Sequence, residues 1–172
     1  SSTSRGLGDV YKRQILDNSK PMVLLDRHGG VKIMMQNRSP VEIVEHYLEL
    51  IMGPNPAAAR IYISSELVIR FTGGRVMQDP TECAAFNKQR YAWVKKRFER
   101  TDLVTETGDG THIVYNIGTL YGAWPDGTTF EGNRYVDRYV LLNGLIIFMD
   151  VWNDSAEWLL DPTLMNKDGD RL

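Results

Sequence analysis

Four polar side chains recur at every second position of one β-rich segment. They are Asn133, Tyr135, Asp137 and Tyr139. Residues two apart share one face of a strand, so these four would form one polar, aromatic wall. A carboxylate in such a wall can exchange protons with a ligand, and a tyrosine hydroxyl can donate to a developing oxyanion. The alternation leaves two arrangements open, because this face either lines a hollow or meets solvent or a second copy of the chain.

A second candidate acid, Asp150, follows directly on the apolar segment 145–149. We expect burial to disfavour its charged form and to raise its pKa into the range useful for acid–base catalysis. Phe148 and Trp152 lie two residues to either side and would shield it from water. Replacing such an acid by Asn should leave stability unchanged or raise it. The alternative is a structural carboxylate that pairs with an arginine or caps the strand end.

His112 is the candidate general base, because histidine titrates near neutral pH. It begins a β-rich segment directly after the turn 108–110, where a solvated histidine is the alternative. Tyr115 and Tyr121 share one face of that segment, whereas Asn116 shares the face of His112. Only one of these two sets can line a hollow.

No metal or cofactor site is predicted. The chain has three histidines, which are scattered, and one cysteine, Cys83, so it lacks the spacing of a zinc cage. We interpret Cys83 as a small buried apolar residue and His46 as an ordinary surface residue. The glycines at 108 and 110 lie between two strands, whereas a phosphate-binding loop needs a helix to follow.

The charge pattern argues against two classes of partner. The 172 residues carry a formal net charge of −2, with 24% charged residues, which does not favour a nucleic-acid-binding protein. The basic run from Lys88 to Arg100 is interpreted as the solvated face of a helix. No apolar run approaches the ~18 residues of a membrane span. We therefore expect neither a nucleic-acid nor a membrane partner.

Local signals place the elements that must position these residues. Ser39, Pro40 and Glu42 match a capping box, which predicts a helix that ends at Gly53-Pro54. Further helices are predicted at 56–63 and, from the apolar stripe of Phe86, Trp93, Val94 and Phe98, at 79–98. Strands are predicted at 67–71, 103–107, 112–123, 129–142 and 145–153, with Asn143-Gly144 as a hairpin turn.

This order predicts the fold class. Helices followed by a run of strands indicate an α+β protein rather than alternating βαβ units. We expect a cone-like, curved antiparallel sheet wrapped around about three N-terminal helices. Such a sheet leaves a hollow that the helices cap incompletely, and this hollow is the natural ligand site.

Residues 1–34 differ from the rest of the chain. Residues 1–14 show no apolar periodicity and resemble translated sequencing-adapter sequence, which suggests a metagenomic origin. We expect 1–34 to be an artefact or a disordered leader, with the biological start at Met34 or Met35. Residues 35–162 would form a single domain and 163–172 a flexible tail. A secretory signal is not predicted, so the expected location is cytoplasmic.

The C-terminal strands carry a resemblance to a known family. Asn133-Arg134-Tyr135 is followed, eleven residues after Asn133, by Gly144 and then by Asp150 and aromatic residues. In these features, over residues 38–160, the chain resembles the SnoaL-like branch of the nuclear transport factor two-like superfamily. That branch includes limonene epoxide hydrolase, steroid isomerase and polyketide cyclase relatives. The resemblance implies a cofactor-free enzyme, an isomerase, cyclase, dehydratase or hydrolase, acting on a hydrophobic, oxygenated ligand.

The resemblance also suggests roles for the candidate residues. Asp150 would transfer the proton, Tyr135 or Tyr115 would donate to an oxyanion, and Asp137 would orient the ligand, with His112 as a further acid–base candidate. Ligand-binding roles fall to Asn133, Tyr139, Tyr115, Tyr121, Phe148 and Trp152. The family resemblance and the abundance of tryptophan further predict a homodimer formed through the outer face of the sheet. A non-catalytic ligand-binding or dimerisation module of the same fold is the alternative.

Two departures from the family pattern limit this transfer. Limonene epoxide hydrolase relatives use an Arg-x-Asp pair where this chain has Ile117-Gly118-Thr119-Leu120, so that activity is not expected. The last strand is also one residue short between Gly144 and Asp150. Either Asp150 takes the position of the cavity carboxylate after a bulge, or Val151 does and the acid is lost.

Overall fold

The computed structural model describes residues 22–25, 31–34, 38–106 and 110–160 and divides the chain into two units, 1–37 and 38–172. In the first unit, β1 (Met22–Leu25) and β2 (Val31–Met34) form an antiparallel pair. The adapter-like residues 1–14 and the expected tail 163–172 lie outside the described residues. The interpretation of 1–34 as a leader stays a prediction.

Three of the helices described in the second unit begin at or next to the predicted residues, whereas a fourth, Ser155–Leu160, is not predicted from the sequence. Helix α1 (Pro40–Ile51) is capped reciprocally, because Ser39 Oγ accepts from the Glu42 amide at 3.3 Å while the Glu42 carboxylate accepts from the Ser39 amide at 2.7 Å. A 3-10 helix, η1 (Pro56–Tyr62), follows. Helix α2 (Pro80–Arg90) is capped by Asp79, which accepts from the Thr81 amide at 2.8 Å.

The helix predicted at 79–98 is too long. Helix α2 ends at Arg90, and residues Trp93–Glu106 form strand β5, which also contains residues 103–106 of the strand predicted at 103–107. Aromatic and β-branched residues favour a strand here, and Val94, Lys96 and Phe98 follow its period of two. Their pairing with β6 (Thr111–Ala123) along the whole strand outweighs the helical spacing of the apolar stripe.

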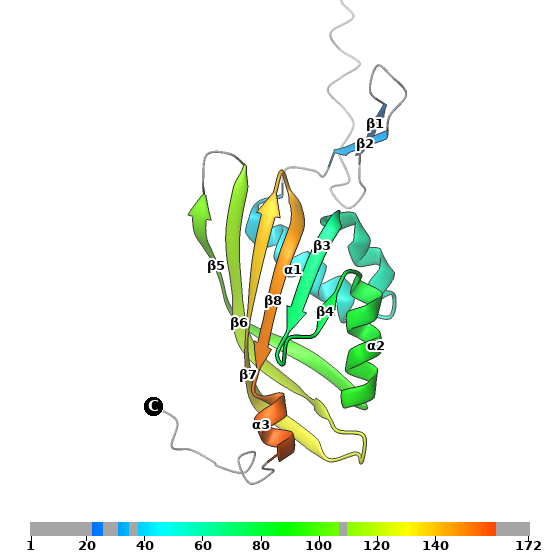
Figure 1. Cartoon of the computed structure of the whole chain (residues 1–172), viewed down its shortest axis with the longest axis vertical. Coiled ribbons are helices and arrows are strands. Elements are labelled where there is room, and N and C mark those ends of the chain that lie inside the picture. Colours follow the sequence, from blue (N-terminus) through cyan, green and yellow to red (C-terminus); the bar gives the residue numbers. More distant parts are fainter. Residues whose placement is uncertain (1–21, 26–30, 35–37, 107–109, 161–172) are drawn as a thin grey trace, which may run out of the picture. The chain divides into compact units, whose positions relative to one another are not determined.

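The sheet of the second unit has the strand order β4-β3-β8-β7-β6-β5 (Figure 1). Its remaining strands are β3 (Ile63–Phe71), β4 (Val76–Met77), β6 (Thr111–Ala123), β7 (Thr129–Leu142) and β8 (Leu145–Asn153), and helix α3 (Ser155–Leu160) follows them. The predicted hairpin turn joins β7 to β8, where Asn143 and Gly144 both have positive φ, as such a turn requires. The α+β class is confirmed. One pairing, β3 with β8, is parallel, so the sheet is not wholly antiparallel.

One face of the sheet packs against the helices and forms the core. The even-numbered residues of β6 from Val114 to Gly122 are buried, and so are the odd-numbered residues of β7 from Asn133 to Leu141. Asn133, Tyr135, Asp137 and Tyr139 therefore all point to this inner face. Helix α1 contacts β5 and β6. A cluster of buried aromatic residues completes the core: Tyr91, Trp124, Phe130, Tyr135 and Trp158, together with Leu120.

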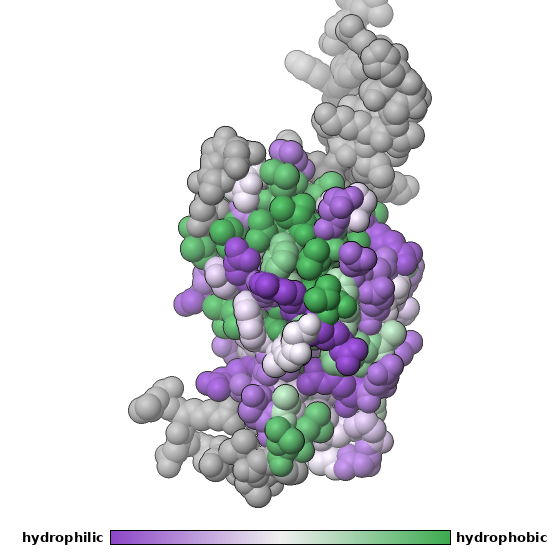
Figure 2. Space-filling model, in the orientation of Figure 1, coloured by the Kyte–Doolittle hydropathy of each residue, from purple (hydrophilic) through white to green (hydrophobic). Residues whose placement is uncertain are grey.

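Strands β5 and β6 approach each other closely at Gly118. A Cβ atom built on Gly118 would lie 2.1 Å from the Arg97 carbonyl oxygen, so only glycine fits there. The opposite face of the sheet, seen in Figure 2, carries apolar side chains near the β7–β8 turn and hydrophilic ones across its middle. No helix among the described residues is long and apolar enough to cross a membrane.

Candidate functional site

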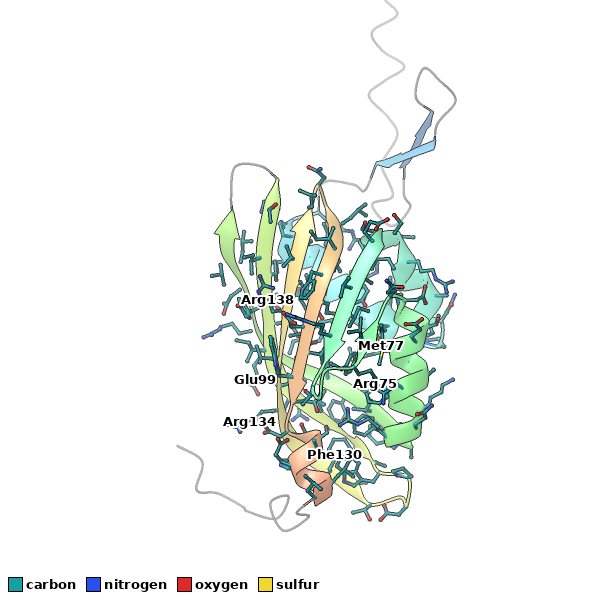
Figure 3. All side chains as sticks on the ribbon, viewed as in Figure 1. Arg75, Met77, Glu99, Phe130, Arg134 and Arg138 are labelled. Atoms are coloured by element: carbon teal, nitrogen blue, oxygen red, sulfur yellow. The ribbon has the colours of Figure 1, made fainter. Side chains whose placement is uncertain are left out.

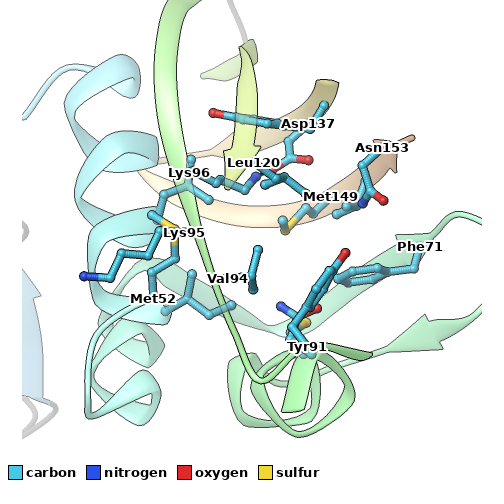
Figure 4. Close-up of a pocket in the computed structure, with 16 residues that line it drawn as sticks. Met52, Phe71, Tyr91, Val94, Lys95, Lys96, Leu120, Asp137, Met149 and Asn153 are labelled. Carbon is cyan, nitrogen blue, oxygen red and sulfur yellow. The ribbon is translucent and has the colours of Figure 1, made fainter. Parts of the chain in front are cut away.

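A cavity of about 70 Å³, measured as the space open to the centres of water molecules, lies between α1, α2 and the inner face of the sheet (Figure 4). Most of its wall is apolar. The apolar lining residues are Leu48, Ile51, Met52, Phe71, Val94, Leu120, Met149 and Val151, and the others are Cys83, Asn87, Tyr91, Lys95, Lys96, Tyr135, Asp137 and Asn153. An apolar hollow with a few polar groups is the usual form of a small-molecule site.

The chemically distinctive group in this cavity is a buried ion pair between Lys96 on β5 and Asp137 on β7. The Asp137 side chain is fully buried, and that of Lys96 keeps only 13% of its surface exposed. The Tyr139 hydroxyl donates to Asp137 Oδ2 at 3.1 Å. The second carboxylate oxygen, Oδ1, has no hydrogen-bond partner among the residues that the structure describes.

Burial sets the proton affinities of this pair. It raises the pKa of Asp137, while the charge of Lys96 and the hydrogen bonds from Lys96 and Tyr139 act in the opposite direction. The same burial lowers the pKa of Lys96, which its attraction to Asp137 offsets in part. Both charged forms are therefore less favoured than in water. The two proton affinities lie closer together than in water, so the pair can hold a proton or pass it on.

The Tyr135 ring packs against the Lys96 ammonium group. Lys96 Nζ lies 3.8 Å from the centroid of the Tyr135 ring, within the range of a cation–π interaction. The Tyr135 hydroxyl donates to Asn116 Oδ1 at 2.6 Å, and Asn116 Nδ2 donates to Thr101 Oγ1 at 2.8 Å. Burial also raises the pKa of Tyr135, so the group stays protonated. Its proton is used by Asn116 rather than offered to the cavity.

Asp150 lies on the other face of the sheet. A bulge at Ile147 shifts the alternation of β8, so that Met149 and Val151 line the cavity and Asp150 points away from it. The prediction that Asp150 lines the hollow is therefore wrong. Val151 takes the position that a cavity carboxylate would need.

Asp150 is instead held by two arginines. Its carboxylate accepts from Arg70 Nε at 2.8 Å and from Arg138 Nη1 at 3.5 Å, and its side chain is 7% exposed. Figure 3 shows Arg138 reaching from β7 toward β8. Phe148 and Trp152 also lie on this face, where Phe148 packs under the Arg70 guanidinium and Trp152 is 44% exposed. Asp150 is therefore a structural carboxylate that pairs with arginines, the second of the two interpretations of its sequence.

The remaining candidates divide between the two faces. Tyr115 and Tyr121 are partly exposed on the outer face, opposite the cavity. Asn133 is buried on the inner face, but it donates to Ser155 Oγ at 3.0 Å and does not line the cavity. His112 is the second residue of β6 and does not line the cavity either. Of the predicted site residues, the structure brings Tyr135 and Asp137 to the cavity, with Tyr139 behind Asp137.

Lys96 is the lining residue whose interpretation changes most. Lys96 was assigned to a solvated helix face, whereas it ends against Asp137 inside the sheet. Cys83 is buried as expected, and burial raises the pKa of its thiol to about 12. The thiol therefore stays protonated at neutral pH. Among the described residues, no three His, Cys, Asp or Glu side chains gather as a metal site would require.

Solved structures share this architecture. An NTF2-like protein from Burkholderia thailandensis matches with a TM-score of 0.55 at 17% identity, over 69% of this chain and 93% of its own. A SnoaL-like polyketide cyclase from Jannaschia sp. CCS1 matches with a TM-score of 0.53 at 19% identity, over 78% of this chain and 99% of its own. This chain has the NTF2-like fold. TerC co-crystallised with polyporic acid also shares this architecture, with a TM-score of 0.58 at 13% identity, over 70% of this chain and 95% of its own.

The NTF2-like fold is thus established by structure alone. No protein-family model matches the chain, and no curated protein matches its sequence. The resemblance carried by Asn133, Gly144 and the C-terminal strands is confirmed at the level of the fold. At these identities the neighbours do not transfer an activity, because one fold hosts many functions. Function must be argued from the NTF2-like cavity and its ion pair.

Proposed function

We propose that this protein binds a small hydrophobic, oxygenated molecule in the NTF2-like cavity and catalyses proton transfer on it without a cofactor. Asp137 is the acid–base group, and Lys96 is the cation that stabilises developing negative charge on the ligand oxygen. The reaction class is an isomerisation, cyclisation or dehydration that proceeds through an enolate-like intermediate. This assignment moves the proton-transfer role from Asp150 to Asp137.

One observation carries the proposal: a fully buried carboxylate with an unpartnered oxygen, paired with a lysine, in the wall of an apolar cavity. A buried polar atom without a partner is uncommon in folded proteins and calls for an explanation. A ligand hydroxyl or an acidic C–H group would supply the missing partner. The co-crystallisation of TerC with polyporic acid, an oxygenated aromatic compound, supports this ligand class.

Proton transfer can be tested without knowing the natural substrate. In D₂O, 2-tetralone should exchange its α-hydrogens faster in the presence of the protein than in buffer, as followed by NMR. Asp137→Asn should abolish the added rate, because an amide cannot accept the proton. Asp150→Asn is the matched control, since that carboxylate lies on the other face, and it should retain the rate wherever it remains folded.

Binding can be tested in parallel by thermal shift. 2-Naphthol should raise the unfolding temperature, because a ligand at 100 times its Kd stabilises the folded state by about 2.7 kcal/mol. Naphthalene, which lacks the oxygen, should raise it less, and Asp137→Asn should remove the difference. If 2-naphthol binds but 2-tetralone exchange is unchanged from buffer, the alternative of a non-catalytic ligand-binding module is correct.

A further inference from the structure

Lys96 differs from its neighbour Lys95 in where its amine lies. Both residues line the cavity, but Figure 4 shows the Lys95 amine directed away from it and the Lys96 amine directed toward Asp137. Lys96 Nζ lies over the Tyr135 ring at 3.8 Å from its centroid. The Lys96 side chain lines the cavity, and only 13% of its surface is exposed.

These surroundings are suited to covalent chemistry of an amine. A lysine attacks a carbonyl only as the neutral amine, and a desolvated lysine reaches that form more readily. The neighbouring carboxylate is in direct contact and can receive the proton that the amine must lose. The Tyr135 ring packs against the amine, and the wall of the cavity around it is mostly apolar.

We propose that Lys96 forms a Schiff base with the carbonyl carbon of an aldehyde or ketone that occupies the cavity. This inference rests on the proposed function and deepens it, because it names a carbonyl compound as the ligand and gives Lys96 a covalent role. The site is the juxtaposition of the buried Lys96 amine, the Asp137 carboxylate and an apolar cavity.

The step balances within the site. The Lys96 ammonium transfers one proton to Asp137, and the neutral amine attacks the carbonyl carbon. A proton then moves from nitrogen to the former carbonyl oxygen to give a neutral carbinolamine. Asp137 returns its proton to that hydroxyl group, the C–O bond breaks, and water leaves. The product is a protonated imine on Lys96 beside an ionised Asp137, so the charges of the pair are restored without an oxidant or a reductant.

Reductive trapping tests this directly. The full chain is incubated with benzaldehyde and sodium cyanoborohydride, digested, and analysed by peptide mass spectrometry for benzylated lysine. Lys96 should be labelled several-fold faster than Lys95 and Lys88, because its amine lies beside the Asp137 carboxylate in the cavity wall, whereas the Lys95 amine is directed away from the cavity. Equal labelling of the three lysines, or labelling of Lys95 and Lys88 without Lys96, would overturn the inference.

Two variants separate the covalent role from a structural one. Lys96→Arg keeps a cation beside Asp137 but cannot form an imine, so its fold should persist, checked by circular dichroism, and the Lys96 peptide should carry no adduct. Lys88→Met should leave labelling of Lys96 unchanged, because Lys88 is exposed on α2 and does not line the cavity. Loss of Lys96 labelling in Lys88→Met would contradict the assignment. If 2-tetralone exchange still depends on Asp137 and no Lys96 adduct forms, the Schiff base is refuted and the proposed function stands. If the adduct forms without Asp137-dependent binding or exchange, the proposed function fails.

Discussion

Replacing Asp150 by Asn should destabilise the protein at neutral pH. Its carboxylate is 7% exposed and accepts from Arg70 at 2.8 Å, with Arg138 at 3.5 Å. The amide of Asn can accept from one arginine but carries no charge and presents an N–H group toward the other. Two guanidinium groups would then lie close together without the anion that separates them.

The magnitude follows from the exposure of each partner. A hydrogen bond to a charged group contributes about 1.5–3 kcal/mol. Arg70 is 55% exposed, so solvent screening reduces its share, whereas the longer contact with Arg138 adds mainly through charge. We expect a loss of about 2 kcal/mol in the free energy of unfolding. For a domain of this size, that lowers the unfolding temperature by roughly 8 °C.

Thermal unfolding at pH 7, followed by circular dichroism, measures this loss. Asp102→Asn is the matched control, because the Asp102–Arg100 pair is exposed at the surface and should contribute less than about 1 kcal/mol. A double-mutant cycle with Arg70→Met isolates the pairwise contribution. The reasoning is refuted if Asp150→Asn is as stable as wild type, because the arginines would then not depend on the charge of Asp150.

Three further predictions concern stability. Lys96→Met should lower the free energy of unfolding by about 3–5 kcal/mol, because Asp137 stays buried without its cation. Adding Asp137→Leu should recover part of this loss, as measured by urea unfolding. No recovery would contradict the idea that the loss comes from the unpaired carboxylate. Asp79→Ala should cost about 1 kcal/mol at pH 7 through loss of the helix cap. The hydrogen bond from Arg60 and those from Thr81 hold the pKa of Asp79 at about 2. The stabilisation by Asp79 is therefore complete above the unfolded pKa of about 3.9 and is lost as the pH falls toward 2. An equal loss of stability in Asp79→Ala at pH 7 and at pH 2 would contradict this. Gly118→Ala should cost at least about 1–3 kcal/mol, because its Cβ meets the Arg97 carbonyl, and a calorimetric midpoint equal to wild type would contradict the close approach.

Local signals in the sequence predicted the elements that short-range chemistry determines. The Ser39–Glu42 capping box and the Asn143-Gly144 turn depend on residues only a few positions apart, and both are present. The alternation in β7 left two faces open for Asp137, and the structure places it on the inner one. The capping box and the turn are visible in a window of a few residues, because no distant contact changes them.

The errors arise where distant contacts decide between local alternatives. Residues 93–98 satisfy a helical spacing and a strand alternation at once, and pairing with β6 selects the strand. That same choice turned Lys96 inward, so its role was missed; the alternation of Val94, Lys96 and Phe98 was the available signal. Asp150 was misplaced because a bulge depends on the register between two strands, which residue types do not reveal.

The bulge at Ile147 makes the chemistry of the cavity depend on chain length as well as on side-chain identity. If the β7–β8 turn keeps its register, deletion of one residue at the bulge would turn Asp150 inward and Val151 outward. A carboxylate would then enter the cavity and an aliphatic residue would leave it, with no substitution at either position. Insertion and deletion within β8 are thus an evolutionary and an engineering route to gain or lose an acid in this sheet.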